Sequence, residues 1–247
     1  MARLAPYYKD LDYSYTIGVF PTLELLAHRP EQVLRVLVSS RGEANEGVAK
    51  IRAACAERSI PVVQADRQVD RLAGNEKSYV IGAFHKYAAP LDPSANHVLL
   101  VNPSDAGNLG TIVRTMLGFG VTNLAIVSPA VDLFAPRTLR AAMGATFQLA
   151  FEHFDGIDAY RARFGQRHLY PLMTDGEIDL QQASFRSPYT LAFGPEDAGL
   201  GPEYRALGTS IRIPQGGRVD SLNLAVSVGI ALYAATLQAA QHHADGT

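Results

Sequence analysis

From residue 97 onward, the sequence alternates between short apolar segments typical of strands and longer segments with helical periodicity. Strands are expected at 97–101, 124–127, 147–151, 168–172, 189–193 and 210–213. Helices are expected at 110–119, 136–142 and 157–164, and a long one from 222 to 240. This alternation predicts an α/β fold in which helices cover both faces of a parallel sheet.

The first part of the chain predicts a second, smaller α/β unit. Strands are expected at 33–39, 60–64 and 79–84, and helices at 22–28, 45–58 and 66–72. Two prolines then interrupt the pattern in the segment 88–94. We therefore expect a small domain over 1–88, a linker over 89–95 and a larger domain over 96–247.

Charge and composition limit the class of protein. The net charge is −2, which argues against a protein that coats nucleic acid without specificity. Residues 1–88 hold 12 Lys and Arg against 10 Asp and Glu, whereas residues 89–247 hold 10 against 14. This mild asymmetry permits a nucleic-acid contact through the N-terminal part.

The sequence has no clear pattern for a targeting peptide, a membrane span or a metal site. The N-terminus lacks the apolar core of a signal peptide, and the uncharged segment 222–240 contains polar residues that favour a core or dimer-interface helix over a membrane span. Cys55 is the single cysteine, and the seven histidines show no metal-ligand spacing. We expect a cytoplasmic protein with no disulfide, no membrane segment and no metal site.

Three loops with glycines and polar residues follow expected strands, at 102–110, 194–201 and 214–220. Open parallel sheets bind ligands beyond the carboxyl ends of their strands. Each loop alone is also consistent with an ordinary turn or helix cap, but three together favour a binding site. The loops contain neither the dinucleotide G-x-G-x-x-G pattern, nor a phosphate-binding P-loop, nor a G-x-S-x-G nucleophile elbow.

Arg114 stands out within the helix that follows the first loop. Its neighbours Ile112, Val113, Met116 and Leu117 are apolar, and an unpaired arginine among buried apolar side chains is costly. The sequence therefore predicts that Arg114 has a partner or a function.

Together and in order, the three loops resemble the motifs of the SpoU family of RNA ribose methyltransferases, in the SPOUT superfamily. The matching segments are Asn102…Asp105-Ala-Gly-Asn108-Leu-Gly110-Thr-Ile-Val-Arg114, Phe193-Gly-Pro-Glu196-Asp-Ala-Gly199-Leu and Ile213-Pro-Gln-Gly216…Asp220-Ser221-Leu-Asn223-Leu-Ala. Arg140-Ala-Ala-Met-Gly144-Ala145 is similar to the family's small-residue segment, with Ala142 and Met143 in place of a frequent serine. The resemblance covers roughly residues 96–240. Ala106 stands where the family usually has proline, and Phe20 where its N-terminal domain often has histidine.

The resemblance implies a deep trefoil knot in the C-terminal domain and a small N-terminal domain that holds RNA. It implies S-adenosylmethionine as the cofactor, with backbone contacts from Gly194, Ile213 and Leu222 and close approach permitted by Gly199 and Gly216. It also implies a homodimer in which Arg114 acts across the interface. An arginine stays charged, so we expect Arg114 to be an electrostatic activator rather than a base. The catalytic group that the resemblance implies is Arg114, Asn108, Glu196, Ser221 and Asn223.

Three alternatives remain at this point. The methyl acceptor could be a base, although Ser221, Leu222 and Asn223 with Arg114 favour ribose. The protein could instead be a catalytically silent RNA-binding protein, although retention of all five polar residues argues against this. Finally, the substrate could be transfer RNA; the separate N-terminal domain favours ribosomal RNA.

Overall fold

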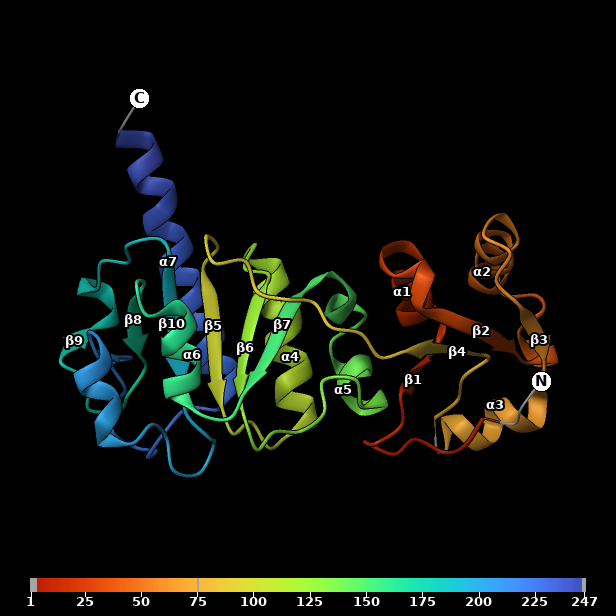
Figure 1. The fold of residues 1–247 in the computed structure, drawn as a ribbon, viewed down its shortest axis with the longest axis horizontal. Coiled ribbons are helices and arrows are strands. Elements are labelled where there is room, and N and C mark those ends of the chain that lie inside the picture. Colours follow the sequence, from red (N-terminus) through yellow and green to blue (C-terminus); the bar gives the residue numbers. More distant parts are fainter. Residues whose placement is uncertain (1–3, 75, 246–247) are drawn as a thin grey trace. The chain divides into compact units, whose positions relative to one another are not determined.

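The structure is a computed structural model that describes residues 4–74 and 76–245, and side chains as far as residue 239. The chain divides into two compact units. The first contains Met1–Tyr87 and Asp132–Gln148, and the second contains Ala88–Val131 and Leu149–Thr247. Each unit is described here by itself (Figure 1).

The second unit contains a parallel sheet, as predicted, with five strands rather than the six expected. Its strand order is β7-β6-β5-β10-β8, which places β5 in the middle. The strands are β5 (His97–Val101), β6 (Asn123–Val127), β7 (Ala150–Phe154), β8 (His168–Pro171) and β10 (Tyr189–Phe193). The helices are α4 (Ala106–Gly118), α6 (Ile157–Phe164) and α7 (Leu224–Asp245), whose last turns extend beyond the sheet in Figure 1.

Both faces of this sheet are covered. Leu99 and Ala192 share one face with Tyr160 and Phe164 of α6, in a buried cluster. Neighbouring residues in a strand point to opposite faces, and their neighbours Val98, Leu100 and Leu191 are completely buried as well. Helices α4 and α7 pack against each other, with the rings of Phe119 and Tyr233 6.2 Å apart.

The first unit contains a four-stranded mixed sheet with the order β1-β4-β2-β3. Its strands are β1 (Tyr13–Ile17), β2 (Val33–Val38), β3 (Val62–Gln64) and β4 (Val80–His85), and its helices are α1 (Val19–His28), α2 (Glu46–Glu57) and α3 (Asp66–Ala73). The strand β1 was not expected. It alternates aromatic and small polar residues, and its polar Ser14 and Thr16 are completely buried, as is Tyr15 between them.

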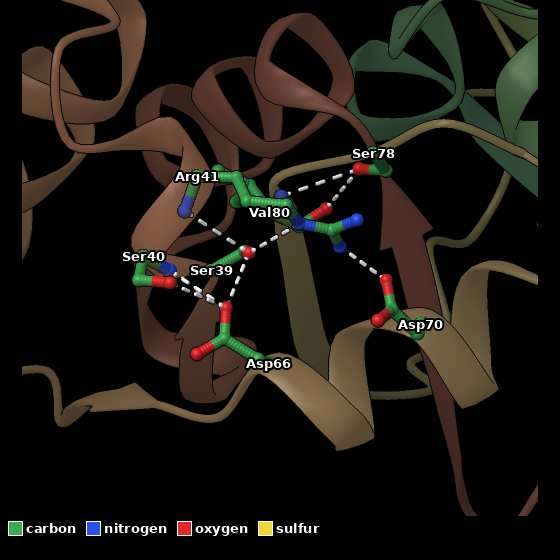
Figure 2. Close-up of polar contacts among 7 residues, drawn as sticks. All are labelled: Ser39, Ser40, Arg41, Asp66, Asp70, Ser78 and Val80. Carbon is green, nitrogen blue, oxygen red and sulfur yellow. Dashed lines mark hydrogen bonds and ion pairs between the residues drawn. The ribbon is translucent and has the colours of Figure 1, made fainter.

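Hydrogen bonds tie the loop after β2 to helix α3 (Figure 2). The Asp66 carboxylate accepts from the Ser39 hydroxyl at 2.5 Å and from the Ser40 amide at 2.8 Å. Those hydrogen bonds hold the pKa of Asp66 below its ordinary value. Arg41 in the same loop forms an ion pair with Asp70 of α3. Three consecutive residues of the loop, Ser39, Ser40 and Arg41, are therefore attached to α3.

The segment Asp132–Gln148 corrects the expected domain division, because it belongs to the first unit although it was placed in the C-terminal domain. It contains α5 (Pro136–Ala141). The rings of Phe134 and Phe147 contact that of Phe84 in β4, at 5.7 and 5.3 Å. Lys86 pairs with Asp132 at 2.8 Å, and the pKa of Asp132 is lowered: burial raises it, but hydrogen bonds from Lys86 and Tyr7 outweigh that effect.

The segment 89–95, expected to be a linker, packs on the second unit. Leu91 is only 3% exposed, and its amide donates to the Glu152 carboxylate at 2.7 Å. Ala89 pairs with Phe151 as an isolated bridge. Strand β7 also begins three residues later than expected, because Ala145–Gln148 forms a 3-10 turn.

Among the described residues, no helix is long and apolar enough to cross a membrane.

Candidate functional site

A pocket of about 270 Å³ lies beyond the carboxyl ends of β8 and β10, within the second unit. Its walls are the segments that follow these two strands and the segment that leads into α7. The lining residues belong to 172–175, 193–200, 211–215 and 220–227. The expected position of a ligand site at strand ends thus coincides with a pocket of this unit.

The pocket depends on a backbone approach at Gly194 that other residues would prevent. A Cβ atom added there would lie 2.2 Å from the carbonyl carbon of Gly199 and 2.4 Å from the amide nitrogen of Leu200. Real Cβ atoms do not come this close to backbone atoms. The two ends of the segment 194–200 therefore come together because position 194 has no side chain.

Gly194→Ala is expected to lower the free energy of unfolding by about 1–3 kcal/mol, because backbone must move to admit the methyl group. The matched control is Gly216→Ala, since an added Cβ at Gly216 meets no atom within 4 Å. Its effect should stay within about 0.5 kcal/mol. Urea unfolding monitored by circular dichroism measures both. Equal stability of the two variants would contradict the close approach.

The predicted cofactor residues are mostly at this pocket. Gly194, Gly199, Ile213 and Leu222 line it, as do the predicted catalytic residues Glu196 and Ser221. Gly216 does not line it and lies in an exposed part of the loop.

The short strand before the third loop differs from expectation. Strand β11 (Ile211–Arg212) has only two residues and pairs with β9 (Ile178–Asp179), outside the main sheet. Ile211 also forms a bridge with Leu172, just past β8. The third loop thus reaches the pocket from a two-stranded extension rather than from a sixth strand of the sheet.

Hydrogen bonds connect all three loops. Asn223 Nδ2 donates to Asn108 Oδ1 at 3.0 Å, and Asn108 Nδ2 donates to Glu196 Oε1 at 3.3 Å. The Ser104 hydroxyl donates to Glu196 Oε2 at 2.9 Å. The structure therefore joins three of the five predicted catalytic residues, and it adds Ser104, which the sequence interpretation missed. A hydroxyl beside the helix-capping Asp105 was the available signal.

Asn223 also begins the last helix. Its Oδ1 accepts from the amides of Ala225 and Val226 at 2.9 and 3.3 Å. The expected cap was Ser221 or a near neighbour, and the neighbour fills this position.

Arg114 lies differently from the sequence-based picture. It is exposed on α4, and among the described residues it has no hydrogen-bond or ion-pair partner. Its apolar neighbours Ile112, Val113 and Met116 are buried on the other side of the helix. At about 3.6 residues per turn, Arg114 lies roughly 120° around the axis from Asn108 and does not line the pocket of its own chain.

The pocket is acidic. Its lining includes four carboxylates and, within the described part of the chain, no Lys, Arg or His: the carboxylates are Asp175, Glu196, Asp197 and Asp220. Partial burial raises the pKa of Glu196, but hydrogen bonds from its own amide, Ser104 and Asn108 outweigh this and hold the pKa below its ordinary value. Such a lining disfavours ligands rich in phosphate and suits a ligand that carries positive charge.

No group of three or more His, Cys, Asp or Glu residues in the described ranges is arranged to hold a metal ion.

The family model of the SpoU rRNA Methylase family matches residues 95–233. The chain belongs to this family. The matched region contains all three loops, the pocket and helix α4, and it includes the segment Asp132–Gln148 that packs in the first unit.

Relatives agree with this membership. The 23S rRNA (uridine(2479)-2'-O)-methyltransferase of Streptomyces viridochromogenes is 31% identical over 149 residues, which is 57% of this chain and 52% of the relative. The 23S rRNA (guanosine-2'-O-)-methyltransferase RlmB of Acinetobacter baylyi is 24% identical over 91% of this chain and 97% of its own. The chain spans about half the length of the Streptomyces relative and of a Synechocystis relative.

Among solved structures, the AdoMet-bound rRNA methyltransferase from Sinorhizobium meliloti has a TM-score of 0.77 and 26% identity. The match covers 91% of this chain and 87% of that one. The structural match therefore includes residues of both units.

Proposed function

We propose that this protein transfers a methyl group from S-adenosylmethionine to a ribose 2'-hydroxyl of ribosomal RNA. The observation that carries the proposal is the pocket of this SpoU family member, where hydrogen bonds join the three motif loops around an acidic cavity. The 23S rRNA 2'-O-methyltransferases among its relatives support ribose as the acceptor and ribosomal RNA as the substrate.

The pocket suits S-adenosylmethionine chemically. The cofactor supplies an electrophilic methyl group on a positively charged sulfur, and it carries an ammonium group. Four carboxylates around the cavity complement these charges, whereas ATP or NAD would bring phosphates into the same field. Phe193, Leu200 and Leu224 add the apolar wall that an adenine ring needs, and Gly194, Ile213 and Leu222 would hold the cofactor through their backbone.

We further propose that the segments around this pocket form the deep trefoil knot of the family. Close backbone contacts support the threading. The Met173 amide donates to the Ile211 carbonyl at 2.9 Å, and a Cβ on Gly176 would lie 2.5 Å from the Ile211 carbonyl carbon. The segment after β8 and the segment before the third loop are therefore in close backbone contact, as expected of two segments that cross in a knot.

We also propose that the protein forms a homodimer through helix α7. Helix α7 exposes apolar side chains at helical spacing along one face: Val226, Ile230, Tyr233 and Leu237, which are 50, 36, 56 and 44% exposed. Thr115 of α4 and Phe119, directly after this helix, lie beside this face, at Gly229 and Tyr233. An apolar face of this kind on a soluble chain is typical of an interface.

The dimer would place Arg114 at the site of the other chain. Within the described part of the chain, Arg114 has no partner and Glu196, an ionised carboxylate, has no ion pair; Arg114 also does not line its own pocket. Helix α4 carries Arg114 next to the apolar face, so a second copy would bring the two charges together. There Arg114 would bind the RNA phosphate or stabilise the developing alkoxide.

The first unit is proposed to hold the RNA. Two aromatic side chains near the ends of its strands are exposed: Phe20 by 49% and Tyr79 by 40%. Exposed aromatic rings are stacking surfaces for unpaired bases, and Arg41 lies in the neighbouring loop.

The test is a map of ribose 2'-O-methylation in total RNA from cells with and without the gene. One or more ribosomal positions should lose the modification, and purified protein with S-adenosylmethionine should restore it on RNA from the deletion strain. Loss of the modification from transfer RNA alone would identify transfer RNA as the substrate instead. Binding of RNA without any methylation would support the alternative of a catalytically silent RNA-binding protein.

A further inference from the structure

Ser104 lies in the loop after β5, at the edge of the site, and no role follows from the motifs for it. Its hydroxyl donates to Glu196 Oε2 at 2.9 Å, while Asn108 Nδ2 occupies the other oxygen, Oε1, at 3.3 Å. Each oxygen of the carboxylate is therefore held by one side chain, and the two donors come from different ends of the same turn.

The second of these donors is part of a hydrogen-bonded chain with one direction. The amides at the start of α7 donate to Asn223 Oδ1, Asn223 Nδ2 donates to Asn108 Oδ1, and Asn108 Nδ2 donates to Glu196. Each side-chain carbonyl oxygen is filled by the preceding donor, so each NH₂ group must face the next member. This series of hydrogen bonds ends at Glu196, whose ionised carboxylate can only accept.

Ser104 does not belong to this series of hydrogen bonds and donates to the other oxygen of Glu196, Oε2. Without it, one carboxylate oxygen would lose its side-chain donor, and Asn108 would be the one side chain left to orient Glu196 beside the backbone amides of Ser104 and of Glu196 itself. The side chain of neighbouring Asp105 cannot replace the hydroxyl, because it caps α4 by accepting from the Asn108 amide at 2.7 Å and has no proton to donate.

The charges around Glu196 make these donors more important. Asp175, Asp197 and Asp220 line the same pocket, and Asp105 lies at the start of α4. The Asp175 carboxylate is paired with Arg205, and the Asp197 carboxylate accepts from the Ala198 amide. Like charges disfavour ionisation of a carboxylate, so the neutral donors must stabilise the charge of Glu196.

We propose that Ser104 is a positioning residue of the methyl-transfer site, which holds the Glu196 carboxylate ionised and in one orientation at the mouth of the pocket. This rests on the function proposed above. The oriented carboxylate presents a fixed negative charge to Arg114 of the second copy, so that the guanidinium points toward the ribose rather than into solvent. Ser104 itself touches neither cofactor nor RNA.

The experiment compares Ser104→Ala with Ser104→Thr, which keeps the hydroxyl, and with Ser94→Ala, which removes an exposed hydroxyl from another loop. The first readout is the titration of the Glu196 carboxylate by ¹³C NMR, assigned with Glu196→Gln. The Ala variant should raise the titration midpoint by about one pH unit, since a hydrogen bond to a charged group is lost. Thr should restore it, and the Ser94 variant should match the wild type.

The second readout is RNA methylation across pH. Ser104→Ala should move the acid limb of kcat to higher pH and lower kcat about tenfold, with little change in KM for RNA or in cofactor affinity. An unshifted midpoint in Ser104→Ala, or a Thr variant no better than Ala, would overturn the proposal.

The two readouts also separate this proposal from the proposed function. A wild type that never methylates RNA, but whose Glu196 midpoint shifts in Ser104→Ala, would refute the function and leave the Ser104–Glu196 assignment standing. If the wild type methylates RNA and Ser104→Ala changes neither the Glu196 midpoint nor kcat, the proposed function stands and the Ser104 assignment is refuted.

Discussion

Arg114→Ala is expected to reduce methyl transfer by at least about 10²–10³-fold, the cost of losing one positioned group that stabilises charge in a transition state. Binding of S-adenosylmethionine should stay within about twofold of the wild type, because the Arg114 side chain does not line the pocket. Single-turnover assays on RNA and calorimetric titration of the cofactor measure the two effects. Loss of cofactor binding together with surviving methylation would contradict the assigned role.

A subunit-mixing experiment tests whether Arg114 acts across the proposed dimer. Arg114→Ala and Glu196→Gln are each expected to be nearly inactive alone. In a mixed dimer, one site would combine an intact Glu196 with an intact Arg114 from the other chain, so random mixing should recover about one quarter of wild-type activity. If Arg114 acted at the pocket of its own chain, every site in the mixture would keep one defect and no activity would return.

Ile230→Asp is expected to separate the proposed dimer into single chains and to lower RNA methylation to the level of Arg114→Ala. The reason is that the substitution places a charge in the centre of the exposed apolar face of α7, where burial without a partner is costly. Light scattering coupled to size-exclusion chromatography should report half the mass. Cofactor binding should persist, because the pocket lies within one chain.

Tyr8→Asp is the matched control for this change, since Tyr8 is a large side chain that is 64% exposed outside the second unit. It should leave the mass and the activity unchanged. A dimer that survives Ile230→Asp, or activity that survives separation into single chains, would refute the proposed interface.

Strong apolar periodicity made much of the second unit predictable. The strands at 97–101 and 189–193 and the helix at 157–164 have the bounds that the sequence indicated. Such segments are buried on both faces or pack along one side, so their residue types follow directly from their position. The polar residues at strand ends likewise indicated the site, because parallel strands bring their carboxyl ends to one edge.

Strand β1 shows where this reasoning failed. Ser14, Tyr15 and Thr16 are all buried, and tertiary hydrogen bonds satisfy the two small polar ones: Ser14 donates to the Phe134 carbonyl, and Thr16 bonds to Thr22 and Gly82. A pattern that reads apolar residues as buried cannot find such a strand. The partner Phe134 lies 120 residues away, in a segment whose own position was not predicted.

The surroundings of Arg114 and Ser104 could not be predicted for a related reason. The exposure of Arg114 depends on which side of α4 meets the sheet, and the hydrogen bond from Ser104 depends on a loop that lies 92 residues further along the chain. Local sequence indicated that both loops carry polar groups. It could not indicate which groups meet, because tertiary packing decides those distances.

The segment Asp132–Gln148 also affects how the protein can be dissected. A fragment that starts at residue 88 would keep Phe134 and Phe147 but lose Phe84, the ring that they contact. Such a fragment would expose apolar surface that is buried in the whole chain. Point variants of Phe20 and Tyr79 are therefore a cleaner test of RNA binding by the first unit than its deletion.

The same segment has a consequence for synthesis of the protein. The first unit is encoded in two pieces, and its second piece follows β5 and β6 of the other unit. A ribosome that adds roughly 5–20 residues per second needs on the order of 3–12 seconds to pass from residue 87 to residue 148. During that interval Phe84 lacks the rings that cover it, so the nascent chain presents an apolar surface that chaperones can bind before the first unit closes.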